Sequence, residues 1–142
     1  MVKQLSVFLQ NKSGRIAGIT RALSEAGIDL RALSIADTTD FGILRMLVSD
    51  VEGAKQTLKK ENCIVSVNEV VVVAVPDEPG GLARILTWMA QECIDIEYMY
   101  SLIERSAEEA YMVFRVSDEP KLLQMLERHG LHSVTAQHLG MK

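Results

Sequence analysis

Val73-Ala74-Val75-Pro76-Asp77-Glu78-Pro79-Gly80-Gly81-Leu82 is an apolar run that breaks into a glycine loop and then enters a helical pattern. The same arrangement occurs 66 positions earlier, in Val7-Phe8-Leu9-Gln10-Asn11-Lys12-Ser13-Gly14-Arg15-Ile16. The register continues without a gap to Ile28-Asp29-Leu30 and Ile94-Asp95-Ile96. Because a repeat of this length marks one structural unit used twice, the chain is predicted to hold two similar modules.

Each copy opens with a predicted strand, because residues 5–10 alternate between apolar and more polar side chains and residues 70–75 are wholly apolar. One amphipathic helix follows each glycine loop, since apolar residues recur there at helical spacing. These residues are Ile16, Ile19, Leu23 and Ala26 in the first copy and Leu82, Ile85, Met89 and Ala90 in the second.

The rest of each copy predicts a hairpin, a second helix and a last strand. The strands are expected at 28–38, 42–49 and 64–68, and at 94–105, 110–117 and 133–139. Turns and helix ends are expected at Thr39-Asp40, Ser106-Ala107-Glu108-Glu109, Asp50, Asp118, Asn62 and Gly130. The order is strand, helix, strand, strand, helix, strand, twice over. It predicts an α+β fold of two ferredoxin-like modules, 1–68 and 69–142, with helices on one face of each antiparallel sheet.

No flexible linker separates the two modules, because residues 64–75 are almost continuous strand-forming sequence. Either the chain turns sharply at Asn68-Glu69, or one long strand crosses between the sheets. Modules of about 70 residues are small for a self-sufficient core, so each is expected to need contact with the other for stability. The apolar strand edges also lead us to expect a homodimer.

Composition narrows the classes of protein that this sequence can represent. The chain has 142 residues, of which 48% are hydrophobic and 24% charged, as expected of a globular protein. It has neither a long apolar segment nor a signal-peptide core, so we expect a cytoplasmic protein without membrane contact. The net charge of -4 and the few aromatic residues argue against nucleic-acid binding. Cys63 and Cys93 lack metal or redox spacing and are predicted to be buried thiols.

The loop motifs resemble those of the ACT domain, a small ligand-binding module attached to many enzymes of amino-acid metabolism. The second copy matches in Asp77-Glu78-Pro79-Gly80-Gly81-Leu82 and Ile94-Asp95-Ile96. The first copy matches in Asn11-Lys12-Ser13-Gly14-Arg15-Ile16 and Gly27-Ile28-Asp29-Leu30, although Ser13 replaces the usual proline. The resemblance covers the whole chain as two tandem copies, with no catalytic domain left over.

The resemblance implies an allosteric sensor. In such proteins an effector, usually an amino acid, binds between the strand-to-helix loop of one domain and the second strand of the other. The implied ligand-binding residues are Asn11, Lys12, Ser13, Gly14, Arg15 and Ile16 of the first loop, Asp77, Glu78, Pro79, Gly80, Gly81 and Leu82 of the second loop, and Asp29, Asp95, Tyr98 and Tyr100 on the second strands.

The chemistry of these residues suits an amino acid. A helix begins after Gly14 and after Gly80, and its unpaired backbone N–H groups can hold a carboxylate. An aspartate at position 29 or 95 can hold an ammonium group. As an alternative, the glycines are structural turns and both aspartates are solvated turn residues.

Other side chains also have a structural interpretation. Tyr98 and Tyr100 share one strand face and are either sheet packing or pocket wall. His129, His132 and His138 lack a ligand pattern and are interpreted as surface residues. Cys93 stands where the first copy has the helix-ending Gly27, so its helix is expected to end differently. The methionines expected to fill the core are Met46, Met89, Met99, Met112 and Met125.

Three classes of function remain open at this point. A sensor binds its effector without turnover, and its target would be a metabolic enzyme or a regulator. A small enzyme of amino-acid metabolism is the second class, but the sequence has no nucleophile elbow, phosphate-binding loop or zinc pair. The third class is a protein-interaction adaptor with a vestigial pocket. No cofactor and no metal are expected.

The two loops predict unequal sites. Lys12 and Arg15 place positive charge beside the first helix start, whereas Asp77 and Glu78 place carboxylates beside the second. Because like charges repel a ligand carboxylate, the site on the first loop is predicted to bind more tightly. Pro79 works the other way, since it rigidifies the second loop.

Overall fold

A computed structural model describes residues 1–10, 12–37, 41–105 and 108–142. The chain divides into two compact units. We call Lys3–Glu69 together with Ala136–Lys142 the first module, and Met1–Val2 together with Val70–Thr135 the second module. These units differ from the division predicted from the sequence, 1–68 and 69–142, chiefly in where the two chain ends belong. The predicted turn residues Thr39-Asp40 and Ser106-Ala107 lie outside the described residues.

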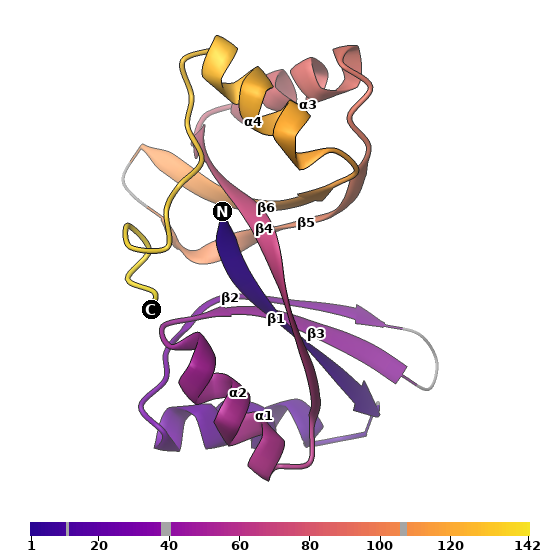
Figure 1. Cartoon of the computed structure of the whole chain (residues 1–142), viewed down its shortest axis with the longest axis vertical. Helices are drawn as coiled ribbons and strands as arrows, with labels where there is room; N and C mark the ends of the chain where they lie inside the picture. The colour runs from indigo at the N-terminus through magenta and orange to yellow at the C-terminus, as the bar shows by residue number, and fades with distance from the viewer. Residues whose placement is uncertain (11, 38–40, 106–107) are drawn as a thin grey trace. The chain divides into compact units, whose positions relative to one another are not determined.

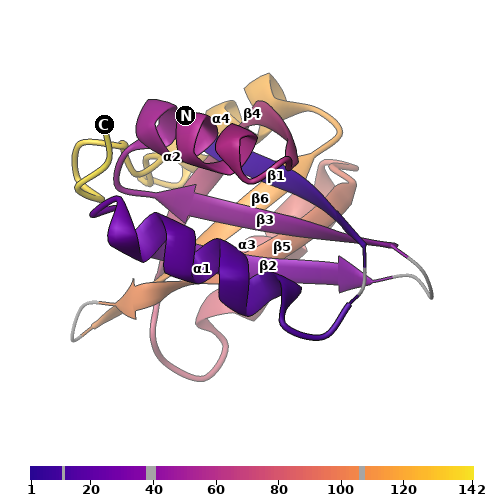
Figure 2. The ribbon, with the colours of Figure 1, turned by 90° about the horizontal axis from the view of Figure 1, so that it is seen from below.

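The first module is a sheet covered on one face by two helices (Figures 1 and 2). Strand β3 pairs antiparallel with both β1 and β2, and Met46 of β3 lies opposite Leu5 and Leu33. Leu5, Ile19 and Leu23 are buried, as the predicted periodicities require. The elements are β1 (Val2–Gln10), α1 (Arg15–Glu25), β2 (Leu30–Asp37), β3 (Phe41–Val48), α2 (Val51–Lys60) and the start of β4 (Ile64–Pro76).

The second module repeats this plan, with α3 and α4 on one face of its sheet (Figure 1). Strand β6 pairs antiparallel with both β4 and β5. Phe114 is fully buried in a core that also holds Met89 and Met125, while Met99 and Met112 pack against that core from partly buried positions. Met46 is fully buried in the first module. The elements are β4, α3 (Gly81–Gln91), β5 (Ile96–Arg105), β6 (Glu109–Val116) and α4 (Glu119–Arg128).

The described residues form six strands and four helices, which fits the predicted pair of ferredoxin-like α+β modules. Of the two chain paths that the sequence left open, the structure has the long strand. Strand β4 runs for 13 residues without a turn at Asn68-Glu69. The predicted final strand at 133–139 is wrong, because only Ser133 makes a bridge, to Val73. The chain then turns, as the amides of Leu139 and Met141 both donate to the carbonyl of Ala136.

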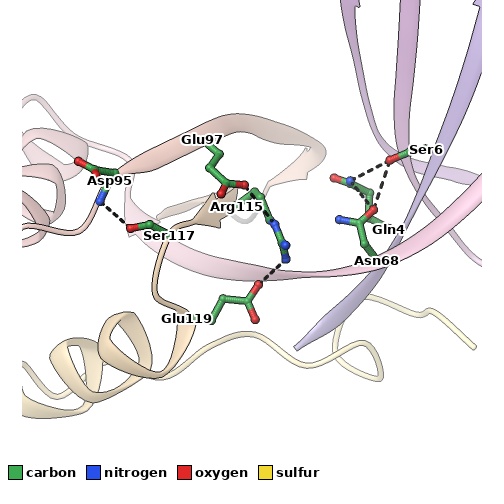
Figure 3. Close-up of polar contacts among 8 residues, drawn as sticks. All are labelled: Gln4, Ser6, Asn68, Asp95, Glu97, Arg115, Ser117 and Glu119. Atoms are coloured by element: carbon green, nitrogen blue, oxygen red, sulfur yellow. Dashed lines mark hydrogen bonds and ion pairs between the residues drawn. The ribbon is translucent and has the colours of Figure 1, made fainter.

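The polar face of β1 is less exposed than its alternating sequence suggests. Gln4 and Ser6 are buried. The Gln4 amide donates to the Ser6 hydroxyl and to the Asn68 side-chain oxygen, both at 3.3 Å (Figure 3). Ser6 Oγ donates to the same Asn68 oxygen at 3.3 Å. These bonds let polar side chains be buried without the penalty of an unsatisfied group.

The predicted helix ends are largely confirmed. Asp50 accepts a hydrogen bond from the Gly53 amide, and Asp118 accepts one from the Lys121 amide, both at 3.1 Å. Asn62 follows the C-cap of α2 with a φ of 60°. Gly130 does the same after α4 with a φ of 74°. Both residue types tolerate this left-handed backbone better than most.

Helix α3 does not end differently from α1, so that prediction for Cys93 is wrong. Gly27 has a φ of 72° and Cys93 a φ of 56°. The amide after each residue reaches back across the helix end, from Ile28 to the Leu23 carbonyl and from Ile94 to the Met89 carbonyl. Cys93 is also exposed, contrary to the prediction of a buried thiol, which holds for Cys63. The left-handed turn carries Cys93 away from the core.

We therefore expect Cys93→Gly to stabilise the second module. A non-glycine residue in the left-handed region is strained, and removing that strain outweighs the greater chain entropy of glycine by about 0.5–1 kcal/mol. Urea unfolding measures the gain. Cys93→Ala is the matched control, because it removes the thiol but keeps the side-chain strain, and it should change stability little. Equal stabilisation by alanine would show that the thiol, not the backbone, is responsible.

Candidate functional site

The loop between β1 and α1 delivers the chain to the helix through a left-handed glycine. Gly14 is the N-cap of α1, with a φ of 81° and no side-chain cap bond. The turn is closed by two backbone bonds, from the Lys12 amide to the Gln10 carbonyl at 2.9 Å and from the Arg15 amide to the Lys12 carbonyl at 3.2 Å. Asn11 lies outside the described residues. A helix start without a side-chain cap leaves its N–H groups to water or a ligand.

A cavity of about 500 Å³ opens at this loop, wholly within the first module. It combines two cationic side chains, two amides and four apolar side chains. Its volume lies in the range of small-molecule sites in proteins. The lining residues are Phe8, Leu9, Gln10, Lys12, Arg15, Phe41, Asn62 and Ile64.

A second, much smaller space lies beside the same loop. It measures about 30 Å³, the volume of roughly one water molecule. Leu9, Gln10, Lys12 and Arg15 line both spaces, and Ile16, Ile35 and Gly42 complete the smaller one. Lys12 and Arg15 are therefore shared by both hollows at the loop.

Arg15 is the first residue of α1, and its side chain is tied to the far end of α2. Its Nη2 donates to the Cys63 sulfur at 3.4 Å. Burial raises the pKa of the Cys63 thiol, while the Arg15 charge opposes that shift and the Glu61 charge adds to it. The thiol is therefore neutral at neutral pH and leaves the positive charge of Arg15 uncancelled beside the cavity.

The second loop copies the turn of the first but differs in charge and space. Gly80 caps α3 with a φ of 86°. The Asp77 amide donates to the Glu108 carbonyl, and the Glu78 carboxylate faces Arg84 at 3.9 Å. Gly81 is buried, whereas its counterpart Arg15 is half-buried and reaches the cavity. Pro79 is exposed, and Leu82 packs against the core of its module.

The two aspartates predicted to hold an ammonium group have equivalent backbone anchors. The Asp29 amide donates to the Ser49 hydroxyl at 2.9 Å, and the Asp95 amide donates to the Ser117 hydroxyl at 3.1 Å (Figure 3). The Asp29 carboxylate pairs with Arg31 at 3.0 Å. Asp29 follows the C-terminal end of α1, whereas Gly14 lies at its N-terminal end. Asp29 lines a separate cavity of about 330 Å³.

The two predicted tyrosines contact each other, and the histidines lie at the surface. Tyr98 and Tyr100 stack with ring centroids 6.4 Å apart, and Tyr100 is buried. His129, His132 and His138 are exposed, as expected. The ring of His129 lies flat on that of Trp88, with centroids 3.7 Å apart.

Of the residues predicted for the site on the first loop, Lys12 and Arg15 line the cavity. Asp29 was predicted to face the loop of the other module, and it lines a separate cavity of its own module. Sequence reasoning missed the cavity walls supplied by Phe8, Phe41, Asn62 and Ile64. Phe8 offered one signal, since it is a large apolar residue on the otherwise polar face of β1. The wall from Asn62 and Ile64 had no such signal, because pairing between distant segments creates it.

The family model of the ACT domain pair matches residues 1–141. The chain belongs to the ACT domain pair family. This confirms the resemblance noted in the loop motifs, and membership supports a regulatory, small-molecule-binding role. A search of curated proteins found no match to this ACT domain pair. No helix of its described residues is long and apolar enough to cross a membrane.

Solved structures share the fold of this ACT domain pair. Protein BT0572 from Bacteroides thetaiotaomicron is 40% identical, with a TM-score of 0.89 over 98% of this chain and 95% of that chain. The regulatory subunit of aspartate kinase from Thermus thermophilus, in its ligand-free form, is 14% identical, with a TM-score of 0.63 over 89% and 91%. Aspartate kinase from Clostridium acetobutylicum is 14% identical, with a TM-score of 0.52 over 89% of this chain and 32% of that chain.

Proposed function

We propose that this ACT domain pair is a regulatory sensor that binds an effector related to an amino acid and holds its carboxylate at the first loop. The observation that carries the proposal is the cavity of about 500 Å³ beside Lys12 and Arg15. The family supports the sensor class. The aspartate kinase neighbours suggest the kind of target, an enzyme of amino-acid metabolism.

The first loop offers three aids to holding a carboxylate. The N–H groups of the α1 start carry the positive end of the helix dipole. Arg15 can add charge-assisted hydrogen bonds, and its guanidinium suits the planar carboxylate. Lys12 adds a second positive charge. Phe8, Phe41 and Ile64 supply an apolar wall for the rest of the ligand.

The second loop is the weaker candidate. Asp77 and Glu78 bring negative charge to its helix start, and Arg84 only partly offsets them. The site on the first loop is therefore proposed to bind more tightly. That each site is completed by the second strand of the other module stays a prediction from the sequence, as do the homodimer and the cytoplasmic location.

The decisive experiment compares Gly14→Val with Gly80→Val. Thermal melting of the wild type against the twenty amino acids and their carboxylic-acid relatives identifies a ligand, since one at 100 times its dissociation constant stabilises by about 2.7 kcal/mol. Gly14→Val should abolish that shift, because valine places a branched side chain and a strained backbone at the carboxylate site.

Gly80→Val is the matched control. Its φ of 86° is close to the 81° of Gly14, and an added Cβ meets nothing within 4 Å at either position, so both variants carry the same backbone penalty. Circular dichroism checks that both fold. Loss of binding in Gly80→Val alone would show that the second loop is the site. If no ligand shifts the melting temperature of the wild type or gives heat in calorimetry, while a partner protein still binds, the adaptor function would be favoured.

A further inference from the structure

The charges around the cavity at the first loop are unbalanced. Lys12 and Arg15 are positive, and Gln10 and Asn62 are neutral amides. The other lining residues are apolar, and none of the described residues that line the cavity carries a carboxylate. A zwitterionic amino acid needs a partner for its ammonium group as well as for its carboxylate.

None of the described carboxylates of the first module lines this cavity. Asp29 pairs with Arg31 and lines a different cavity. Glu61 precedes Asn62 in the chain, but it is exposed and is not part of the lining. Among the described residues that line this cavity, an ammonium group would therefore face two positive side chains and no carboxylate.

The apolar side chains of the cavity are open to solvent. Phe8, Phe41 and Ile64 are exposed by 49%, 62% and 71%, values that are high for such side chains. A ligand with an apolar body would cover them and gain the free energy of removing that surface from water. The volume of about 500 Å³ is ample for a phenyl or branched aliphatic group.

We infer that this cavity is selective for an organic acid with an apolar side chain and no ammonium group, and that a 2-oxo acid binds it better than the amino acid of the same side chain. The inference rests on the proposed function and narrows its ligand class. The carboxylate is matched by Arg15 and Lys12, the oxo group can accept from the Gln10 or Asn62 amide, and the side chain lies on the apolar wall.

The test compares pairs of ligands that share a side chain and a carboxylate and differ only in carrying an oxo group or an ammonium group. The full chain is titrated calorimetrically with phenylpyruvate against L-phenylalanine, and with 4-methyl-2-oxopentanoate against L-leucine. Because like charges placed together are costly, at least one oxo acid should bind at least about tenfold more tightly than its amino acid. Arg15→Gln and Lys12→Gln should each weaken binding of the oxo acid and reduce the ratio of its affinity to that of the matching amino acid.

Arg21→Gln is the matched control, since Arg21 lies on the same helix, is exposed and does not line the cavity. It should leave both affinities unchanged. If the amino acid binds as tightly as the oxo acid or more tightly, the inference is overturned while the sensor function stands. If no amino acid, oxo acid or related carboxylic acid binds, the proposed function fails as well. A ratio that Arg15→Gln and Lys12→Gln do not change would also overturn the inference.

Discussion

Replacing Gly81 with alanine is expected to destabilise the second module by about 3 kcal/mol or more, because the new methyl group has no room. An ideal Cβ on Gly81 would stand 2.1 Å from the carbonyl oxygen of Pro76 and 3.2 Å from its carbon. These are backbone atoms, so a side-chain rotation cannot relieve the overlap. The same carbonyl accepts the amide of Glu78 at 2.9 Å, which fixes it in the turn.

The measurement for Gly81→Ala is urea unfolding followed by circular dichroism. Gly18→Ala is the matched control, since an added Cβ there meets nothing within 4 Å and Gly18 lies inside α1 with ordinary backbone. That control should gain about 0.5–1 kcal/mol, because alanine favours a helix over glycine. Equal stability of Gly81→Ala and the wild type would mean that the second loop is more open than described.

Gly81 also explains how the two copies diverge in function. Its counterpart in the first copy is Arg15, whose side chain lines the cavity, whereas a side chain at position 81 would meet the Pro76 carbonyl. The first helix start therefore presents a cation to its cavity, while the second start is closed around a glycine. The proposed inequality of the two sites thus has a steric cause beside the electrostatic one.

The sequence was sufficient for features that depend on local patterns. The repeat, the buried residues of α1 and the caps at Asp50 and Asp118 followed from spacing and side-chain chemistry. The Lys12 and Arg15 charges at the first helix start were also predicted. Such features are legible because each is decided by residues within a few positions of one another.

Features that depend on distant contacts were not predicted. The cavity wall joins Phe41 of β3 to Ile64 of β4, and only the sheet brings them to the same loop. The end of the chain is a second example. A strand was predicted at 133–139, yet the chain turns at Ala136 and the tail 136–142 belongs to the first module. No local pattern states which surface a tail will cover.

Leu139→Ala is expected to cost about 2–4 kcal/mol of stability, because Leu139 is only 4% exposed and its loss would leave a cavity under the tail. The tail is held by hydrogen bonds as well as by this side chain. The Lys142 amide donates to the Ser49 carbonyl at 2.7 Å, and the Val51 amide donates to the Lys142 carbonyl at 3.4 Å. Residues 49–51 lead into α2, so the tail closes the start of that helix.

Hydrogen exchange distinguishes a docked tail from a general loss of stability. In Leu139→Ala the Val51 amide should exchange faster by a larger factor than amides in the core of the second module, because its partner at Lys142 is released. Gln137→Ala is the matched control, since Gln137 is exposed in the same tail and its loss should change stability by less than about 0.5 kcal/mol. If amide hydrogen exchange became faster by the same factor in both modules, local docking of the tail would be contradicted. Leu139 would then belong to a core common to the whole chain.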